Sequence, residues 1–549
     1  MTTSAAWDDG ALQVPDGFRG VFRTDDRACA VYSESAGIAR ILPDAVAVPA
    51  DADDVVTLVH WAAARGVPLV ARGSATSMAN GALGRGVALD LSRLDWVGAV
   101  DAAQATVACG PGALRDVVDA AARRHALRVA VDPSSGAFCT IGGMVATNAA
   151  GARSVKLGAM RPWVRGLDCV FADGSRAWVR RGEPRPRLDV LRTFQHDVAR
   201  DVRDRGAALA RPGVRKESSG YALADYARSE DLVDLLVGSE GTLALFVGIE
   251  MGLAPVPAAR SALLASFLSL EEAVQAAGRA TALGASAVEL LDRTFLNVVR
   301  AEASALSIPA GADAVLLIEA EGETPAAADT LTLRLTDACR QARAAHVVAA
   351  PDEQTAARIW RIRHAASPIL NALDPNLASM QLIEDGAVPP ESFPDYVRGV
   401  RAALERHGIR GVIFGHAGDA HAHVNAMVDV RDADWRARAR ALMDDVTGLV
   451  ALLGGTLAAE HGDGRLRTPL MFRVWDARAM ALFARVKQAF DPLGILNPGV
   501  KVPRAGDDPL ASVKYDPTLP PLPADARAAL DRIVRERDWA AYRLAQLGE

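Results

Sequence analysis

Short apolar runs alternate with glycine-rich turns over the first third of the chain. This alternation predicts strands at Ala45–Val48, Val67–Ala71 and Val87–Leu91. The apolar spacing across Asp53–Arg65 predicts a helix between the first two strands. A strand, a helix and a second strand in this order are typical of a βαβ unit, so a mixed α and β domain is expected at the N-terminus.

A second series of strands and helices begins after Pro255. Predicted strands are Leu263–Phe267, Ala287–Leu291, Val315–Glu321, Gln381–Glu384, Gly411–Phe414 and His421–Met427. Predicted helices are Ser269–Leu283, Ala326–Ala344, Glu353–Leu373, Glu391–Arg406 and Ala433–Leu453. This order favours an α+β unit with helices on one face of a sheet. A Pro-rich segment then leads into a last predicted amphipathic helix, Ala524–Leu547.

Composition narrows the class of protein. The 549 residues are 50% hydrophobic and carry a formal net charge of −6 without a long basic run, so nucleic acid is not an expected partner. The N-terminal residues do not resemble a secretory signal. The apolar stretch Val446–Ala459 is interrupted by Gly454 and Gly455 and is too short to span a bilayer. We therefore expect a cytoplasmic protein, with peripheral contact to the inner membrane left open.

The cysteines point to no metal or disulfide framework. The five are Cys29, Cys109, Cys139, Cys169 and Cys339, and no two of them form a CxxC pair. This spacing argues against structural disulfides, a zinc knuckle or an iron–sulfur cluster held by this chain alone. We expect each to be a small buried side chain, so that any one-electron relay comes from another chain.

Two stretches of small residues lie in the N-terminal part. Arg72–Ser77 directly follows a strand, and its small side chains would let backbone N–H groups converge on a phosphate, although an ordinary tight turn is the alternative. Asp132–Gly151 is rich in Gly, Ala, Ser and Thr, which suggests backbone lying against a flat group. Together they form a plausible bed for a dinucleotide, with a structural glycine-rich loop as the alternative. Neither contains a GxGxxG pattern, so a nicotinamide Rossmann site is disfavoured.

Four of the ten histidines lie in two glycine-flanked clusters. In the first, His421, His423 and Asn425 alternate and would share one face of a strand. His416 precedes a turn and could fold back onto that face. The pair Glu460–His461 adds a carboxylate and a fourth imidazole. Two imidazoles and a carboxylate suit a divalent transition ion such as zinc or manganese, whereas a lone histidine is usually structural.

Several motifs, in this order, resemble the FAD-linked D-lactate and D-2-hydroxyglutarate dehydrogenases, which are flavoproteins of the vanillyl-alcohol-oxidase type. The motifs are Arg72–Ser77, Pro133–Gly151, Val237–Leu243, His416–Asn425, Glu460–Gly464 and Asp491–Gly499. The resemblance implies an α+β fold, with a PCMH-type FAD-binding domain of two α+β subdomains and an antiparallel-sheet α+β cap. The implied units are residues 1–254 for the FAD-binding domain, 255–455 for the cap, 456–503 for a segment returning to the flavin and 504–549 for a helical tail.

The resemblance implies non-covalent FAD, because the Arg72–Ser77 loop contains no histidine for a covalent link. The residues implied to bind FAD are Arg72, Gly73, Ser74, Ala75, Thr76, Ser77, Pro133, Gly142, Gly143, Thr147, Asn148, Gly151, Ala152, Glu240, Gly241 and Asn497. Relatives usually have more glycine where this chain has Ser74 and Ala75. Both residues are small, so FAD binding is expected to survive the difference.

Other matched residues imply roles around a substrate. Arg363 belongs to a Trp-x-x-Arg segment whose arginine binds the substrate carboxylate, with a surface salt bridge as the alternative. His461 would be the base, and a divalent metal, Zn or Mn, would be held by His416, His423 and Glu460. The residues implied to bind substrate are Arg363, Lys216, Tyr221, His421 and Asn425. His421 stands where relatives often have an asparagine, which changes the expected substrate contacts.

The implied function is oxidation of a small D-2-hydroxy acid, D-lactate or D-2-hydroxyglutarate, by hydride transfer to flavin N5. An iron–sulfur protein, quinone, cytochrome or electron-transferring flavoprotein would then reoxidise the flavin. One alternative within the family is the flavin subunit of a glycolate-type or lactate-type oxidase complex. A metal-dependent hydrolase built on the histidines is the alternative from another class. The sequence leaves the oligomeric state open, with a homodimer as one alternative.

Overall fold

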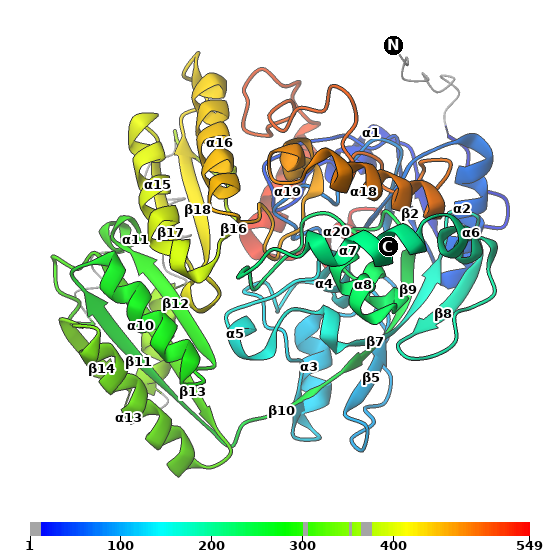
Figure 1. Ribbon diagram of the computed structural model, residues 1–549. Coiled ribbons are helices and arrows are strands. Elements are labelled where there is room, and N and C mark those ends of the chain that lie inside the picture. Colours follow the sequence, from blue (N-terminus) through cyan, green and yellow to red (C-terminus); the bar gives the residue numbers. More distant parts are fainter. Residues whose placement is uncertain (1–11, 300–305, 351–353, 364–375, 549) are drawn as a thin grey trace.

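Two lobes make up the molecule (Figure 1). The computed structural model describes residues 12–299, 306–350, 354–363 and 376–548. The N-terminal lobe carries two four-stranded sheets, and the cap carries a separate eight-stranded sheet. This arrangement confirms the expected α+β fold with two α+β subdomains and a cap. The short strand β10 (Ala254–Pro255) lies where the chain passes from one lobe to the other.

The first sheet is mostly parallel. Its order is β1 (Val21–Arg23), β2 (Ala45–Val48), β4 (Val87–Asp90) and β3 (Leu69–Arg72). Strand β4 pairs in parallel with both β2 and β3, while β1 pairs antiparallel with β2. Helix α2 (Ala52–Arg65) follows β2. Asp51 caps its start, and Gly66 ends it at a φ of 65°. The three predicted strands and the predicted helix are confirmed, with small shifts at their ends.

The second sheet is antiparallel. Its order is β5 (Thr106–Cys109), β9 (Leu245–Gly252), β7 (Val164–Val170) and β8 (Arg176–Arg180). The helices around it are α3 (Arg115–Arg123), α4 (Ile141–Thr147), α6 (Asp189–Asp197), α7 (Ala199–Gly206), α8 (Leu223–Ser229) and α9 (Leu232–Leu236). Helix α4 lies inside the small-residue stretch Asp132–Gly151, for which no helix was predicted. Thr140 caps its start, and Asn148 ends it in the left-handed conformation.

The cap is built on one antiparallel sheet. Its order is β14 (His346–Ala349), β11 (Ala259–Phe267), β13 (Ala314–Gly322), β12 (Ala287–Asp292), β17 (Arg410–His416), β18 (His421–Val428) and β15 (Ala378–Met380), with β16 (Gly386–Ala387) paired to β18. One face is covered by α10 (Leu270–Ala282), α13 (Pro325–Gln341), α15 (Phe393–Arg406) and α16 (Trp435–Leu452). On the other face, α11 (Arg293–Val298) and Ile359 pack on Leu264 and Leu317. Helices therefore cover both faces, not one as predicted.

Two predictions in the cap need correction or fall outside the structure. The strand predicted at Gln381–Glu384 is wrong, since β15 ends at Met380 and the next strand, β16, begins at Gly386. The backbone leaves the sheet there, and Ala459 N–H donates to the carbonyl of Asp385 at 3.0 Å. Residues 354–363 of the helix predicted at Glu353–Leu373 are helical, and the remainder lies outside the described residues.

The C-terminal tail forms two helices instead of the single predicted one. They are α19 (Ala524–Glu536) and α20 (Ala541–Ala545). Arg537 ends α19 at a φ of 57°, which turns the chain so that Trp539 is buried against Tyr32 and Val46 of the N-terminal lobe. All five cysteines are buried and unpaired, as predicted. Among the described residues, no helix has the length and apolar character to cross a membrane.

Candidate active site

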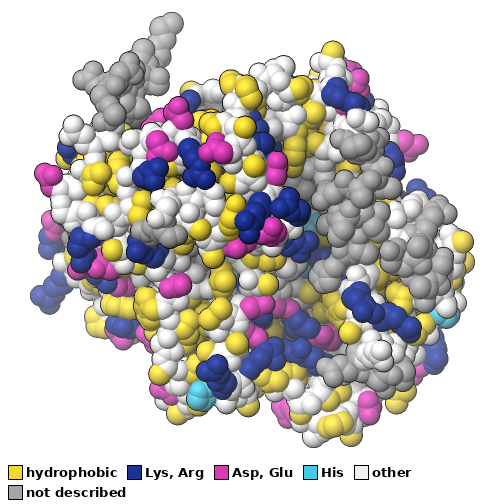
Figure 2. All heavy atoms as spheres, turned by 180° about the vertical axis from the view of Figure 1, so that it is seen from behind, with side chains coloured by type: hydrophobic (Ala, Val, Ile, Leu, Met, Phe, Trp, Pro, Cys, Tyr) yellow, Lys and Arg dark blue, Asp and Glu magenta, His cyan; other side chains and the backbone are white. Residues whose placement is uncertain are grey.

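A cavity of about 1040 Å³ lies between the N-terminal lobe and the cap. The surface is hollowed near the middle of the face seen in Figure 2, and Lys and Arg side chains gather around the hollow. Arginines of both lobes line the cavity, among them Arg72, Arg153, Arg260 and Arg363. Positive charge in a recess favours anionic ligands.

The predicted FAD-binding residues meet at this cavity. Those that line it are Arg72, Gly73, Ser74, Ala75, Thr76, Ser77, Pro133, Gly142, Gly143, Thr147, Gly151, Ala152, Glu240 and Gly241. Asn148 and Asn497 do not line it. The Asn148 side chain accepts from the Arg161 N–H at 2.9 Å, and Asn497 donates to the carbonyls of Gly81 and Glu240 at 3.0 and 2.9 Å. Both asparagines therefore hold nearby backbone segments in place without lining the cavity themselves.

The Arg72–Ser77 loop offers donors that the described protein atoms do not use. Nε and Nη2 of Arg72 and the hydroxyls of Ser74 and Ser77 are buried without a hydrogen-bond partner in the described structure. Buried polar groups normally have partners. These residues line the cavity, so a bound diphosphate would supply the missing acceptors and the loop fits that group.

A close contact fixes the same loop against helix α4. A Cβ placed on Gly73 would lie 2.1 Å from Oγ1 of Thr140. That hydroxyl accepts from the Gly143 N–H at 3.3 Å and caps α4. Glycine at position 73 therefore lets the loop and the helix start approach each other.

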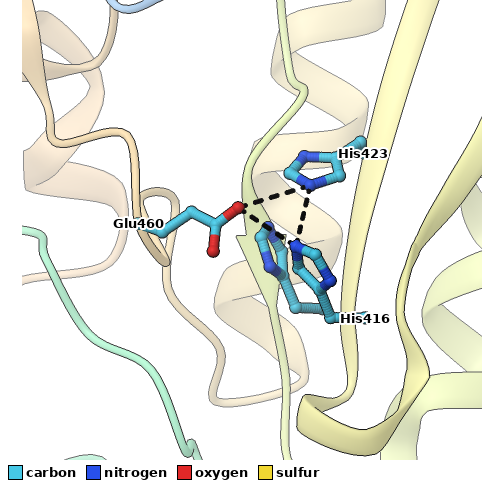
Figure 3. A group of neighbouring side chains, drawn as sticks. His416, His423 and Glu460 are labelled. Atoms are coloured by element: carbon cyan, nitrogen blue, oxygen red, sulfur yellow. Dashed lines mark hydrogen bonds and ion pairs between the residues drawn. The ribbon is translucent and has the colours of Figure 1, made fainter. Parts of the chain in front are cut away.

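Three ligand atoms converge on the cap side of the cavity (Figure 3). His416 ends β17, His423 lies on β18, and Glu460 lies between α16 and α17 (Gly464–Arg467). We call these three residues the ligand triad. Nε2 of His416 and Nε2 of His423 are 3.4 Å apart, and they lie 3.2 and 3.4 Å from Oε1 of Glu460. Such a set of imidazole and carboxylate donors can hold a divalent cation.

The outer ring nitrogens of the two histidines are fixed by other groups. Nδ1 of His416 lies 2.5 Å from Oε1 of Glu289, and Nδ1 of His423 lies 2.9 Å from the carbonyl of Glu384. When both Nδ1 atoms donate, the two Nε2 lone pairs face Glu460. Three acceptors then meet with no donor between them, which is the arrangement expected of metal ligands.

His461 lies beside the triad in a strongly acidic setting. Its Nδ1 is 2.8 Å from Oε2 of Glu384, and its backbone N–H donates to Asp385 at 2.9 Å. Burial alone would lower the pKa of His461, but the carboxylates of Glu384 and Asp385 outweigh it and raise the pKa to about 9. Nε2 of His461 lies 3.7 Å from Oε1 of Glu460. In the protein without a metal, His461 is therefore an imidazolium at neutral pH.

Arg363 lines the cavity and is oriented from behind by Glu289. Its Nε donates to Oε2 of Glu289, and its guanidinium lies over the ring of Phe414 at 5.0 Å from the centroid. Burial of Glu289 would raise the pKa of its carboxyl, but His416 and Arg363 lower the pKa to about 2. One fully buried carboxylate thus supports both a triad histidine and the predicted carboxylate-binding arginine.

Only one of the remaining predicted substrate-binding residues lines the cavity. Asn425 lines the cavity, whereas Lys216, Tyr221 and His421 do not. The ammonium of Lys216 pairs with Oε2 of Glu460 at 2.8 Å. The Tyr221 hydroxyl shares a hydrogen bond of 2.8 Å with Thr242. His421 is fully buried, and its burial holds its pKa well below the usual range; its ring offers a ligand atom within 4.8 Å of those of the triad.

Comparison with known proteins agrees with this geometry. Residues 43–180 match the family described as "FAD binding domain", and residues 256–500 match "FAD linked oxidases, C-terminal domain". The two matches meet at the cavity described above. The chain belongs to the FAD-linked oxidases.

Relatives of this FAD-linked oxidase include several named hydroxy-acid enzymes. Glycolate oxidase subunit GlcD of Bacillus subtilis is 29% identical over 83% of this chain and 88% of the relative. D-2-hydroxyglutarate dehydrogenase of Pseudomonas putida is 28% identical over 96% of this chain, but the match covers only 54% of that longer protein. The 4-ethylphenol oxidase from Gulosibacter chungangensis has a similar fold, with a TM-score of 0.65 at 16% identity over 88% of this chain and 94% of that one.

Sequence reasoning missed Glu289 in this FAD-linked oxidase. It lies in the apolar stretch Ala287–Leu291, which was predicted only as a strand. A carboxylate in the middle of a buried strand needs partners, and that feature was visible in the sequence. Its partners come from β17 and from residues 354–363, so their identity required the fold.

Proposed function

We propose that this FAD-linked oxidase oxidises a small D-2-hydroxy acid to the corresponding 2-oxo acid. The observation that carries the proposal is that the ligand triad, His461 and Arg363 line the same cavity as the flavin-binding loops. The names of the relatives support the substrate class, and D-lactate and D-2-hydroxyglutarate are the first candidates.

The side chains divide the work of binding and proton transfer. Arg363 binds the substrate carboxylate, and Glu289 keeps the guanidinium turned toward the cavity. His461 accepts the hydroxyl proton in its neutral form, and Glu384 stabilises the imidazolium that results. FAD held by the Arg72–Ser77 loop and the Pro133–Gly151 segment would supply the acceptor for the hydride of the substrate Cα, while His461 takes up the hydroxyl proton.

The donor set of the ligand triad fits a divalent metal, with Zn or Mn as the first candidates. Such an ion would polarise the substrate hydroxyl and, by adding positive charge beside His461, lower the pKa of that imidazole toward neutrality. Lys216 would remain paired with the second oxygen of Glu460 and hold the carboxylate in place.

One experiment tests the proposal directly. The purified holoenzyme is mixed anaerobically with D-lactate, L-lactate, D-2-hydroxyglutarate, glycolate or malate, and the flavin absorbance is followed with and without a chelator. We expect bleaching by a D-2-hydroxy acid, slowed by the chelator and restored by Zn or Mn. Bleaching by none of these acids would contradict the proposed function, and full bleaching after complete metal removal would contradict the metal.

The flavin subunit of a glycolate-type oxidase complex is the second candidate. It is favoured by the match to the Bacillus subtilis subunit, which covers most of both chains. Rapid reduction of an artificial dye by the purified chain alone would count against it. In either case we propose that an iron–sulfur protein, quinone, cytochrome or electron-transferring flavoprotein accepts the electrons, in the cytoplasm or at the inner membrane surface.

A further inference from the structure

The C-terminal tail forms part of the wall of the flavin cavity. This segment lies after both family matches, the later of which ends at residue 500. Its residues that line the cavity are Lys514, Tyr515, Val534, Arg537 and Trp539. None of them belongs to the sequence motifs that predict the flavin site.

Contacts place the tail at the predicted pyrophosphate loop. The Lys514 ammonium donates to the carbonyl of Ser35 at 3.0 Å, and the N–H of the next residue, Ala36, donates to the carbonyl of Ala75 at 3.0 Å. The Arg537 guanidinium lies 5.8 Å from the ring centroid of Phe138. The tail thus meets the cavity beside the small-residue loops of the N-terminal lobe, whereas the ligand triad is supplied from the cap side.

The tail is held there by its own packing. Ala526, Ala529, Leu530 and Ile533 of α19 join one hydrophobic cluster with residues of α1 (Asp26–Val31) and β2. Arg543 of α20 is fully buried and donates to the carbonyls of Val31 and Glu34. This packing makes the tail a fixed wall and not a loose extension.

The side chains of this wall have the chemistry that a nucleotide requires. Tyr515 and Val534 line the cavity, and their large, mainly apolar side chains are 37% and 49% exposed. Together with Phe138 they offer flat and apolar contact to an aromatic base. Lys514 and Arg537 add positive charge beside them, which suits a diphosphate. Arg72 and Ser74 on the adjoining loop supply the buried unpaired donors described above.

We infer that the tail holds the adenosine diphosphate half of FAD. Tyr515 and Val534 pack on the adenine, while Arg537 and Lys514 pair with the diphosphate. The small-residue loops and the cap contact the isoalloxazine half.

Binding of FAD and of FMN to the apoprotein tests this inference, because FMN lacks the adenosine monophosphate part of FAD and keeps only one of the two phosphates. We expect the triple variant Tyr515→Ala, Val534→Ala, Arg537→Ala to raise the Kd for FAD about tenfold, which corresponds to losing one good base stack, and to raise the Kd for FMN much less. Arg535→Ala is the matched control. This residue lies on α19 next to Val534, has a side chain 68% exposed and does not line the cavity.

Each outcome decides the inference. An unchanged Kd for FAD in the triple variant, or equal losses for FAD and FMN, would overturn it. If the triple variant melts well below the wild type, the single variant Arg537→Ala is titrated in the same way, since its side chain is exposed. Trypsin cleavage at the tail arginines gives a second measurement, and we expect FAD and ADP to protect the tail while FMN does not. The test uses no hydroxy acid, so its result is independent of the proposed substrate.

Discussion

Glu289 joins two functional groups that lie far apart in the sequence. It is fully buried, and its two oxygens meet Nδ1 of His416 and Nε of Arg363. Groups that orient metal ligands from behind typically change metal affinity by about 10- to 100-fold when they are altered. We therefore expect Glu289→Gln to weaken Zn binding by about that factor, since the amide keeps the shape but loses the charge. Competition with a chelating dye measures the affinity.

The same substitution separates a positioning role from a purely structural one. Glu289→Gln should raise KM for the hydroxy acid through Arg363 while the Kd for FAD stays constant. Glu405→Gln, on the exposed side of α15, is the control and should change neither quantity. Unchanged Zn affinity and unchanged KM in a folded Glu289→Gln protein would show that the carboxylate only fills the core.

The raised pKa of His461 gives a pH dependence with a definite sign. In the metal-free protein the folded-state pKa is about 9, whereas an unfolded histidine has a pKa of about 6.5. Between these values the folded protein binds a proton that the unfolded protein does not. The stabilisation from His461 is therefore fully present below about pH 6.5 and is lost as the pH rises through 9. Urea unfolding of chelated wild type and His461→Gln at a series of pH values measures it.

The difference in free energy of unfolding between these two proteins should shrink as the pH rises from 6.5 to 9. A difference that stays constant over this range would mean that the imidazole does not gain its proton from the pairing with Glu384 and Asp385. Added Zn should move the dependence to lower pH, because the cation opposes protonation of the neighbouring ring.

At the scale of elements, the site depends on close approach between the Arg72–Ser77 loop and the start of α4. Gly73→Ala would push a Cβ against Oγ1 of Thr140, so we expect the cap of α4 to be lost and FAD to bind more weakly. Gly278→Ala is the matched control, because this glycine lies within α10 and a Cβ there meets nothing within 4 Å. The control should stabilise the protein by about 0.5–1 kcal/mol through helix propensity. Equal FAD affinity in the two variants would refute the packing argument.

The elements themselves were largely predictable from the sequence, because local periodicity determines them. The strands at Ala45–Val48 and His421–Met427 appear nearly as predicted. The strand at Gln381–Glu384 was wrong because Glu384 and Asp385 bind the His461 segment, a contact almost eighty residues away in the chain that local pattern does not contain. The break at Arg537 was missed for a similar reason, since it follows from burial of Trp539 against another lobe element.

The candidate site was likewise only partly predictable from the sequence. The residues that motif order assigns to the triad and to the flavin loops mostly line one cavity in the structure. Lys216, Tyr221 and His421 do not line this cavity, although the ring of His421 lies within 4.8 Å of the ligand atoms of the triad. Residues that act through another side chain, such as Glu289, could be found only after the strands were paired.

At the scale of the whole molecule, a single cavity shared by two lobes requires the lobes to stay docked. Arg128 and Arg153 of the N-terminal lobe pair with Glu321 and Glu319 of β13 in the cap. The Arg128 pair is bidentate, at 2.6 and 2.8 Å, and its carboxylate is almost fully buried. Arg128 and Arg153 also line the cavity, so the contacts that dock the cap form part of the wall of the site.

Removing one charge from this interface should lower the free energy of unfolding more than removing one charge from an exposed ion pair would. Glu321→Gln leaves Arg128 buried and only partly compensated, and breaking a buried pair in this way typically costs about 3–5 kcal/mol. We expect a lower unfolding midpoint together with faster hydrogen exchange in β13 and around Arg128, because both sides of the interface open. Glu323→Gln, an exposed residue of the same cap two positions later, should leave both measurements unchanged. If exchange accelerates only within β13, the carboxylate stabilises the cap alone, and docking of the lobes depends on the remaining contacts around the cavity.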